Sequence, residues 1–163
     1  AQGHHGQPVT LLVTPGRAAT AVQRWQARSA TGLLTLVHLP WLSQVDFDHL
    51  LWACDLNLVR GEDSLVRALW AGQPLVWQLY PQDDGAHVPK LQAFLDTVQA
   101  TEAARTWHAA WNPAAPGGPA QTWPYPDDAA WQAWQAQALA CSQVLRSQAD
   151  LATQLIRFAA ETG

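Results

Sequence analysis

Short apolar runs alternate with amphipathic segments over the first hundred residues. The runs are mainly apolar and lack strict alternation, which is typical of strands buried on both faces of a parallel sheet. Four strands are therefore predicted, at residues 9–14, 33–39, 56–59 and 75–80. Segments with helical spacing follow each of them, at residues 18–28, 45–54, 65–71 and 88–99. This order predicts an α/β fold, a Rossmann-like parallel sheet flanked by helices on both faces.

The pattern changes after residue 100. Residues 113–126 hold five prolines and two adjacent glycines, and we expect a loop there. From Asp127 to the end, at residues 127–163, the spacing is helical, and Asp127 and Asp128 stand where carboxylates favour the helix dipole. One apolar stripe along this segment is predicted to be packing rather than a ligand platform, and consists of Trp131, Trp134, Ala138, Cys141, Leu145, Leu151, Leu155 and Phe158. We treat residues 1–163 as one domain.

Composition and charge exclude several classes of protein. Hydrophobic residues make up 48% of the chain and charged residues 13%, so a disordered tail is excluded. The net charge of -4 and the lack of a basic block argue against nucleic acid as a partner. The sequence contains no run of about 18 apolar residues, so no membrane span is predicted. We also see no secretion signal, and we expect a cytoplasmic protein. The absence of methionine fits a fragment or a processed chain.

Two residue types that often carry chemistry, cysteine and histidine, give weak signals here. Cys54 and Cys141 stand in apolar surroundings, and we interpret them as buried free thiols of a reducing compartment. The adjacent His4 and His5 alone are weak evidence for a metal site. We expect neither a metal nor a cofactor.

The most informative stretch lies between Leu50 and Asp84. A short strand ends in Arg60, and Gly61-Glu62-Asp63-Ser64 leads into a helix. Ligands of open α/β sheets bind beyond the carboxyl ends of strands, and a helix N-terminus offers free N–H groups to a phosphate. Arg60 can add a bidentate cationic contact, Ser64 a hydroxyl, and Gly61 a close backbone approach. The pattern is compatible with a diphosphate site that needs no metal.

A purely structural interpretation of the same residues stays open. Asp63 or Ser64 can cap the helix, and Glu62 can complement its dipole. Strand, glycine and helix follow one another in α/β proteins of many functions, so the spacing alone does not decide.

The run from Asp48 to Ser64, DHLLWACDLNLVRGEDS, closely resembles the signature of the EarP family of protein-arginine rhamnosyltransferases, which modify translation elongation factor P. The resemblance extends over roughly residues 39–96. Its continuation consists of Val66-Arg67-Ala68, Trp70-Ala71-Gly72, Pro74, Val76-Trp77 and Tyr80-Pro81-Gln82.

The resemblance implies a two-domain GT-B glycosyltransferase, of which this chain would be the C-terminal half that binds the donor dTDP-β-L-rhamnose. It implies that Arg60, Glu62, Asp63 and Ser64 hold the diphosphate and the sugar, with Glu62 and Arg60 as the catalytic residues, and that Tyr80 contacts a phosphate. The acceptor would be an arginine of elongation factor P.

The resemblance also extends to Leu39-Pro40-Trp41-Leu42-Ser43-Gln44, which is similar to the family's thymine-binding loop. Trp41 stands where the family more often has phenylalanine, and it can still stack on the base. Gln44 matches a glutamine that hydrogen-bonds the nucleoside.

The general base of the family is an aspartate of the N-terminal domain, and nothing in this chain corresponds to it. Asp48 and Asp55 belong to the matched signature and are expected to serve local structure. We therefore expect the chain alone to transfer no rhamnose. Two alternatives are a non-catalytic nucleotide-sugar-binding or regulatory module, and an NAD-binding Rossmann domain. The second is disfavoured because no Gly-x-Gly-x-x-Gly follows the first strand.

Overall fold

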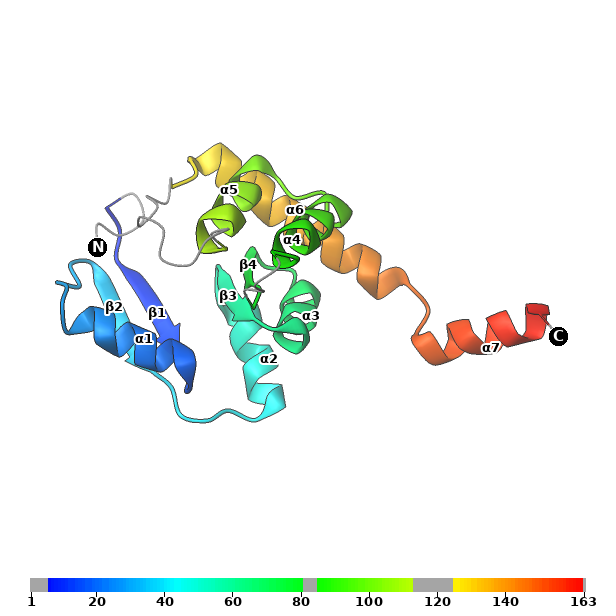
Figure 1. The fold of residues 1–163 in the computed structure, drawn as a ribbon, viewed down its shortest axis with the longest axis horizontal. Helices are drawn as coiled ribbons and strands as arrows, with labels where there is room; N and C mark the ends of the chain where they lie inside the picture. The colour runs from blue at the N-terminus through cyan, green and yellow to red at the C-terminus, as the bar shows by residue number, and fades with distance from the viewer. Residues whose placement is uncertain (1–5, 81–84, 113–124, 163) are drawn as a thin grey trace. The chain divides into compact units, whose positions relative to one another are not determined.

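The computed structural model describes residues 6–80, 85–112 and 125–162, which fall into two compact units, Ala1–Phe47 and Asp48–Gly163. Each unit is described by itself (Figure 1). The strands are β1 (Val9–Val13), β2 (Leu34–His38), β3 (Asn57–Arg60) and β4 (Leu75–Gln78). The helices are α1 (Arg17–Gln26), α2 (Gln44–Ala53), α3 (Glu62–Ala71), α4 (His87–Thr97), α5 (Glu102–Trp111), α6 (Asp128–Ser147) and α7 (Leu151–Thr162).

The strands form two parallel pairs, one in each unit. In the first unit β1 pairs with β2, with Val9 opposite Leu34, and in the second β3 pairs with β4, with Asn57 opposite Leu75. The predicted α/β class and the parallel pairing are confirmed. The strands are grouped as two pairs where the sequence predicted a single sheet, because apolar runs locate strands without saying which strands are neighbours.

Most helix limits agree with the prediction to within a few residues, and local chemistry explains them. Ser43 caps α2, since its hydroxyl accepts a hydrogen bond from the Asp46 amide at 3.1 Å and donates one to the Asp46 carboxylate at 2.7 Å. Helix α3 ends at Gly72, which adopts the left-handed conformation, with φ 73°. A Cβ at Gly72 would lie 3.2 Å from Cβ of Ser142, so α6 approaches α3 closely there.

Helix α5 lies where the sequence predicts no helix, and Thr101 caps it by accepting from the Ala104 amide. The C-terminal helices expected over residues 127–163 are α6 and α7. They are separate because the backbone is extended at Gln148 and Asp150 then accepts from the Thr153 amide at 2.9 Å. Asp127 does cap α6, accepting from the Ala130 amide.

The core of the second unit is built from β4, α5 and α6. Trp134 is only 2% exposed and packs with Val76, Ala104 and Trp107, so the interpretation of this tryptophan as packing is confirmed. A cavity of about 20 Å³ beside His108 holds no more than a water molecule. The stripe's last members, in α7, are exposed, and these are Leu151, Leu155 and Phe158.

Side chains of α5 pair with the backbone of β4 as a neighbouring strand would. The Trp77 amide donates to Nε2 of His108 at 3.0 Å, and the Leu79 amide donates to Oδ1 of Asn112 at 2.8 Å. Nδ2 of Asn112 returns a hydrogen bond to the Trp77 carbonyl. Nδ1 of His108 lies 2.8 Å from the Ala104 carbonyl, so this nitrogen carries the proton of a neutral ring. Burial lowers the pKa of His108 to about 4.

Both cysteines are free and half-buried rather than fully buried, and desolvation raises the pKa of each thiol. Within residues 6–80, 85–112 and 125–162, no helix combines the length and the apolar character that crossing a membrane requires. His4, His5 and most of the predicted loop, residues 113–124, lie outside the described residues.

Candidate functional site

The polar residues picked out in the sequence gather at the carboxyl end of the β3–β4 pair. Because the pair is parallel, both strands end at the same edge, with Arg60 opposite Gln78. Tyr80 follows two residues beyond β4, and Gly61 joins Arg60 directly to α3. This is where ligands of parallel sheets bind.

Helix α3 begins with an open N-terminus. Its N-cap is Gly61, with φ 81° and ψ 166°, a conformation that is accessible essentially to glycine alone. No side chain caps this end of the helix. Neither Asp63 nor Ser64 is therefore the cap, and the helix starts at Glu62 rather than near Leu65. The backbone N–H groups of the first turn can donate hydrogen bonds to a bound anion, and the helix dipole favours negative charge at this end.

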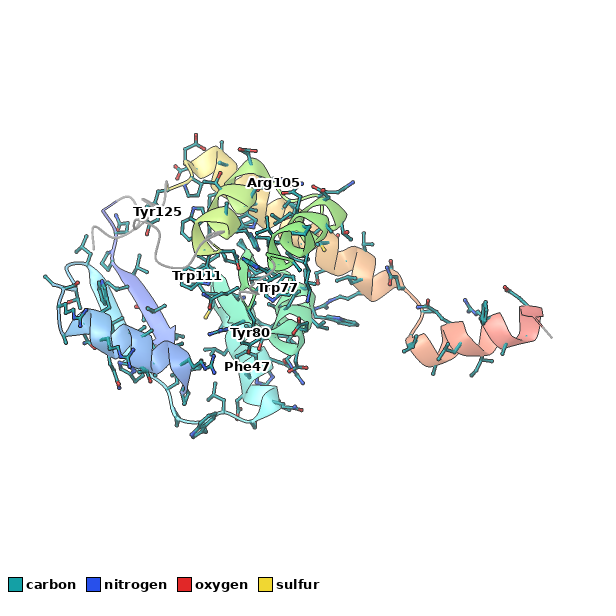
Figure 2. The ribbon with its side chains drawn as sticks, in the orientation of Figure 1. Phe47, Trp77, Tyr80, Arg105, Trp111 and Tyr125 are labelled. Carbon is teal, nitrogen blue, oxygen red and sulfur yellow. The ribbon has the colours of Figure 1, made fainter. Side chains whose placement is uncertain are left out.

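Arg60 and Tyr80 meet beside this helix end. The Cζ atom of Arg60 lies 4.3 Å from the centroid of the Tyr80 ring, within the range of a cation–π contact. A Cβ on Gly61 would lie 3.8 Å from Oη of Tyr80, so the phenol also lies against the N-cap. Nε of Arg60 is buried without a hydrogen-bond partner, and Tyr80 is 53% exposed. Tyr80 is labelled in Figure 2. Among the described residues, the Arg60 guanidinium is thus held by stacking and not by a carboxylate.

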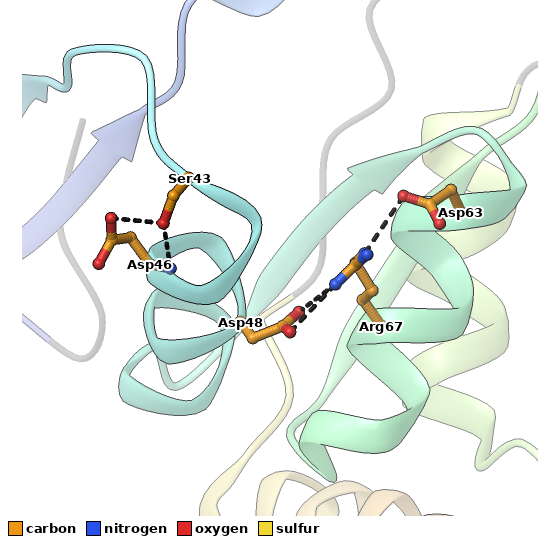
Figure 3. A network of polar contacts seen from close by, with 5 residues as sticks. All are labelled: Ser43, Asp46, Asp48, Asp63 and Arg67. Atoms are coloured by element: carbon orange, nitrogen blue, oxygen red, sulfur yellow. Dashed lines mark hydrogen bonds and ion pairs between the residues drawn. The ribbon is translucent and has the colours of Figure 1, made fainter.

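Arg67 ties two aspartates of the signature together. Its Nη1 donates to both carboxylate oxygens of Asp48, at 2.9 and 3.0 Å, and its Nε donates to Asp63 at 3.2 Å (Figure 3). These hydrogen bonds, foremost the one that Arg67 donates to Asp48, raise the pKa of Arg67. The contact joins α2 to α3, so the expectation that Asp48 serves local structure is confirmed. The Asp63 carboxylate is engaged by the same arginine.

Glu62 forms an ion pair with Lys90, which no sequence motif connects to it. Nζ of Lys90, from α4, lies 2.8 Å from Oε1 of Glu62. The hydrogen bond from Lys90 lowers the pKa of the Glu62 carboxyl. Lys90 is 28 residues away along the chain, and no local pattern connects the two. Only the packing of α4 against the strand pair brings them together.

In the first unit, the corresponding edge carries an open hollow. It lies at the carboxyl ends of β1 and β2, and its lining includes Arg17, Arg24 and His38. Trp41 follows β2 three residues beyond its end, and its side chain is 83% exposed. Gln44 is exposed at the first position of α2.

The structure thus brings Arg60, Gly61, Glu62 and Tyr80 together, with Ser64 half-buried in the first turn of α3. Trp41 and Gln44 belong to the first unit, and it stays a prediction that they bind the same ligand as the residues of the second unit. The binding roles of the residues in both units also stay predictions. Pro81 and Gln82 of the signature lie outside the described residues. Within the part of the chain that is described, no three His, Cys, Asp or Glu side chains gather as metal ligands would.

Comparisons with known proteins identify the family of this chain. A profile of the EarP family, the elongation-factor P (EF-P) rhamnosyltransferases, matches residues 1–160. A protein-arginine rhamnosyltransferase of Pseudomonas aeruginosa is 42% identical over 95% of this chain and 44% of its own length. One of Pseudomonas putida is 50% identical over 55% of this chain and 26% of its own length. The chain therefore spans less than half the length of these relatives.

A solved structure, from work on the structural basis for EarP-mediated arginine glycosylation of translation elongation factor EF-P, superposes with a TM-score of 0.71. Its sequence is 36% identical, and the match covers 96% of this chain and 53% of that one. Sequence and fold agree over nearly the whole chain, and the chain belongs to the EarP family of elongation-factor P rhamnosyltransferases.

Proposed function

We propose that this chain is the donor-binding part of an inverting GT-B glycosyltransferase that transfers rhamnose from dTDP-β-L-rhamnose to an arginine of elongation factor P. The observation that carries the proposal is the stacked Arg60–Tyr80 pair beside the uncapped N-terminus of α3. Family membership supports the acceptor and the sugar, since the relatives are protein-arginine rhamnosyltransferases. Elongation factor P works in translation, so we propose a cytoplasmic site of action.

The diphosphate is assigned to the end of α3 because three favourable terms coincide there. The first-turn N–H groups are without a side-chain cap, the helix dipole is positive at this end, and Arg60 adds a permanent charge. Arg60 reaches no carboxylate among the described residues, so its charge is available to a ligand. The Tyr80 hydroxyl, next to Gly61, can donate to a phosphate oxygen.

The nucleoside is assigned to the first unit. An indole that is 83% exposed is costly to leave in water, and it offers a flat face to a base. Trp41 also stands just beyond the carboxyl end of β2, where α/β proteins bind ligands. Gln44, exposed at the start of α2, can donate to and accept from a pyrimidine edge.

In the proposed reaction an arginine nitrogen of the acceptor attacks the anomeric carbon while the dTDP group leaves from the opposite face. The new C–N bond forms as the C–O bond breaks, so the β-linked donor gives an α-linked product. Negative charge develops on the leaving diphosphate, and Arg60, Ser64 and the helix end stabilise it. Glu62 is assigned to the sugar or the acceptor, because its charge is wrong for a phosphate.

No carboxylate of this site is proposed as the general base. Asp48 and Asp63 are both engaged by Arg67, and Asp46 by Ser43. We therefore assign proton removal from the acceptor to a part of the longer protein outside this chain.

Calorimetry of this chain with dTDP-rhamnose, dTDP and NAD, each with and without EDTA, tests the proposal. dTDP-rhamnose and dTDP should both bind, each with the same affinity in the presence and absence of EDTA. NAD should not bind. Binding of NAD in preference to dTDP, or loss of dTDP binding in EDTA, would contradict it. Incubation of the chain with donor and elongation factor P should leave the mass of the factor unchanged, and a gain of one deoxyhexose would refute the assignment of the base.

A further inference from the structure

The Glu62–Lys90 pair joins two elements at the mouth of the proposed diphosphate site. Glu62 is the first residue of α3, next to the N-cap, and Lys90 reaches it from α4 at 2.8 Å. Both side chains are solvent-exposed, at 65% for Glu62 and 53% for Lys90. An exposed ion pair of this kind adds little to folding stability. Its position therefore has to be explained by something other than stability.

Lys90 is placed independently of Glu62. Its Nζ lies 5.4 Å from the centroid of the Trp77 ring, within cation–π distance. Trp77 is itself fixed, since it is 4% exposed, packs edge-on against Phe94, and has its amide bound by His108. Trp77 lies in β4, and Tyr80 follows two residues beyond the end of this strand; both are labelled in Figure 2. A rigid aromatic surface thus directs the lysine towards the start of α3.

The Glu62 carboxylate at the start of α3 carries the same sign of charge as the proposed diphosphate, and Lys90 can offset it. A carboxylate at the first helical position repels a diphosphate bound to the same helix end. Arg67 already engages Asp63 and Asp48, and Arg60 is stacked on Tyr80. Lys90 is the cation that contacts Glu62 among the described residues. The carboxyl group does not lose its charge by protonation either, because Lys90 lowers its pKa.

We propose that Lys90 is the counter-ion of Glu62: it neutralises and orients this carboxylate, so that a functional glutamate and an anionic diphosphate can occupy the same helix end. The inference rests on the proposed donor site and extends it. Lys90 is a positioning residue, because it acts through Glu62 rather than on the reacting atoms.

A double-substitution cycle tests the inference, with dTDP titrated into this chain by calorimetry. Lys90→Gln should weaken dTDP binding by about tenfold, the effect of one uncompensated charge close to a phosphate at a solvent-exposed site. Lys90→Arg should keep the wild-type affinity. Glu62→Gln leaves Lys90 as an uncompensated cation near the phosphates and should bind dTDP at least as tightly as wild type. The double variant Glu62→Gln/Lys90→Gln should return to within about threefold of wild type, because no carboxylate is left to neutralise. Arg157→Gln removes the same charge from exposed α7 and should have no effect.

Two results would overturn the inference while leaving the donor site intact. If Lys90→Gln binds dTDP as wild type does, the pair has no role in binding. If the double variant is as weak as Lys90→Gln, the lysine contacts the phosphates directly and does not act through Glu62. A folded wild-type chain that binds no dTDP would instead overturn the proposed function, and this inference with it.

Discussion

The chain contains two junctions at which a parallel strand leads through a glycine N-cap into a helix, and their surroundings differ. Gly16, with φ 107° and ψ -147°, starts α1 three residues beyond the end of β1, whereas Gly61, with φ 81° and ψ 166°, joins β3 directly to α3. Both glycines are N-caps, and neither helix end has a side-chain cap. Around Gly16 no atom lies within 4 Å of an added Cβ, whereas at Gly61 the Tyr80 ring does.

The difference shows that a helix N-terminus becomes a candidate site only when other elements supply groups to it. At the second junction, Tyr80 comes from beyond β4, Arg60 from β3 and Lys90 from α4. The first junction has Arg17 and Arg24 from its own helix and His38 from β2, around an open hollow. We therefore assign the diphosphate to the second junction.

The second junction also lies in the more densely packed of the two units. In the part of the chain that the structure describes, Val13 is the buried core residue of the first unit, and the remaining buried hydrophobic residues belong to the second. The second junction is built on strands whose edge is bonded to His108 and Asn112. Preorganised groups bind and stabilise charge better than mobile ones, so this rigidity favours the second junction as well.

The largest expected effect concerns the scaffold of the second junction. The folded pKa of His108 is about 4, below its ordinary value of 6.5. The neutral ring therefore contributes stability that is present above pH 6.5 and is lost as the pH falls towards 4, by about 3 kcal/mol in full. Urea unfolding at pH 7.5 and 4.5 should show this loss. In His108→Gln, whose amide can still accept from Trp77, the loss should be smaller, and an equal loss in both proteins would contradict the assignment.

The next effect separates the two junctions by charge. Arg60→Ala should weaken dTDP binding by about ten- to a hundredfold, because a charge-assisted hydrogen bond contributes about 1.5–3 kcal/mol. Arg17→Ala removes the same charge beside Gly16 and should change affinity less than about threefold. Calorimetry on both variants makes the comparison. The assignment fails if Arg17→Ala is the more damaging substitution.

Alanine substitutions of the two N-cap glycines distinguish an effect on fold stability from an effect on dTDP affinity. Gly16→Ala and Gly61→Ala should each destabilise the fold by about 1–3 kcal/mol, since both positions have backbone conformations that are strained for alanine. Only Gly61→Ala should also weaken dTDP binding, because the added methyl group lies at the phosphate-facing end of α3. Thermal unfolding and dTDP titration of both proteins measure the two effects. Equal losses of affinity would contradict the comparison.

No loss of dTDP affinity is expected from Glu62→Gln, because the substitution removes a negative charge close to the proposed phosphate site and leaves the Lys90 cation in place. Rhamnose transfer by the longer protein carrying the same substitution should fall strongly. A dTDP affinity that falls with transfer would show that Glu62 holds the nucleotide rather than the sugar or acceptor.

Much of the scaffold could be predicted from the sequence, because the evidence for it is local. Apolar runs located all four strands, and Gly72 with Pro74 marked the end of α3. Helix α5 was missed although Thr101 gives a cap signal and Ala104, Trp107 and Trp111 follow at helical spacing. The helices expected over residues 127–163 are present, but the point where α6 ends could not be located, because Asp150, which starts the next helix, interrupts no apolar repeat.

The contacts of the site could be predicted only in part. Arg60, Gly61 and Glu62 are consecutive, so their grouping needs no tertiary information. The stacking of Arg60 on Tyr80 and the reach of Lys90 depend on how β4 and α4 pack, and neither follows from spacing. The pairing of the Asp63 carboxylate, 83% exposed, with Arg67 follows the i, i+4 spacing of opposite charges, and the binding role of Asp63 stays a prediction.

The most direct test of the central claim is a titration of the ¹⁵N-labelled chain with dTDP, followed by the amide resonances at both helix starts. If the diphosphate binds the second junction, the amides of Glu62, Asp63 and Ser64 should shift in proportion to saturation, while those of Arg17 and Ala18 should not. Shifts at Arg17 and Ala18 without shifts at Glu62 to Ser64 would place the anion at the first junction and contradict the account.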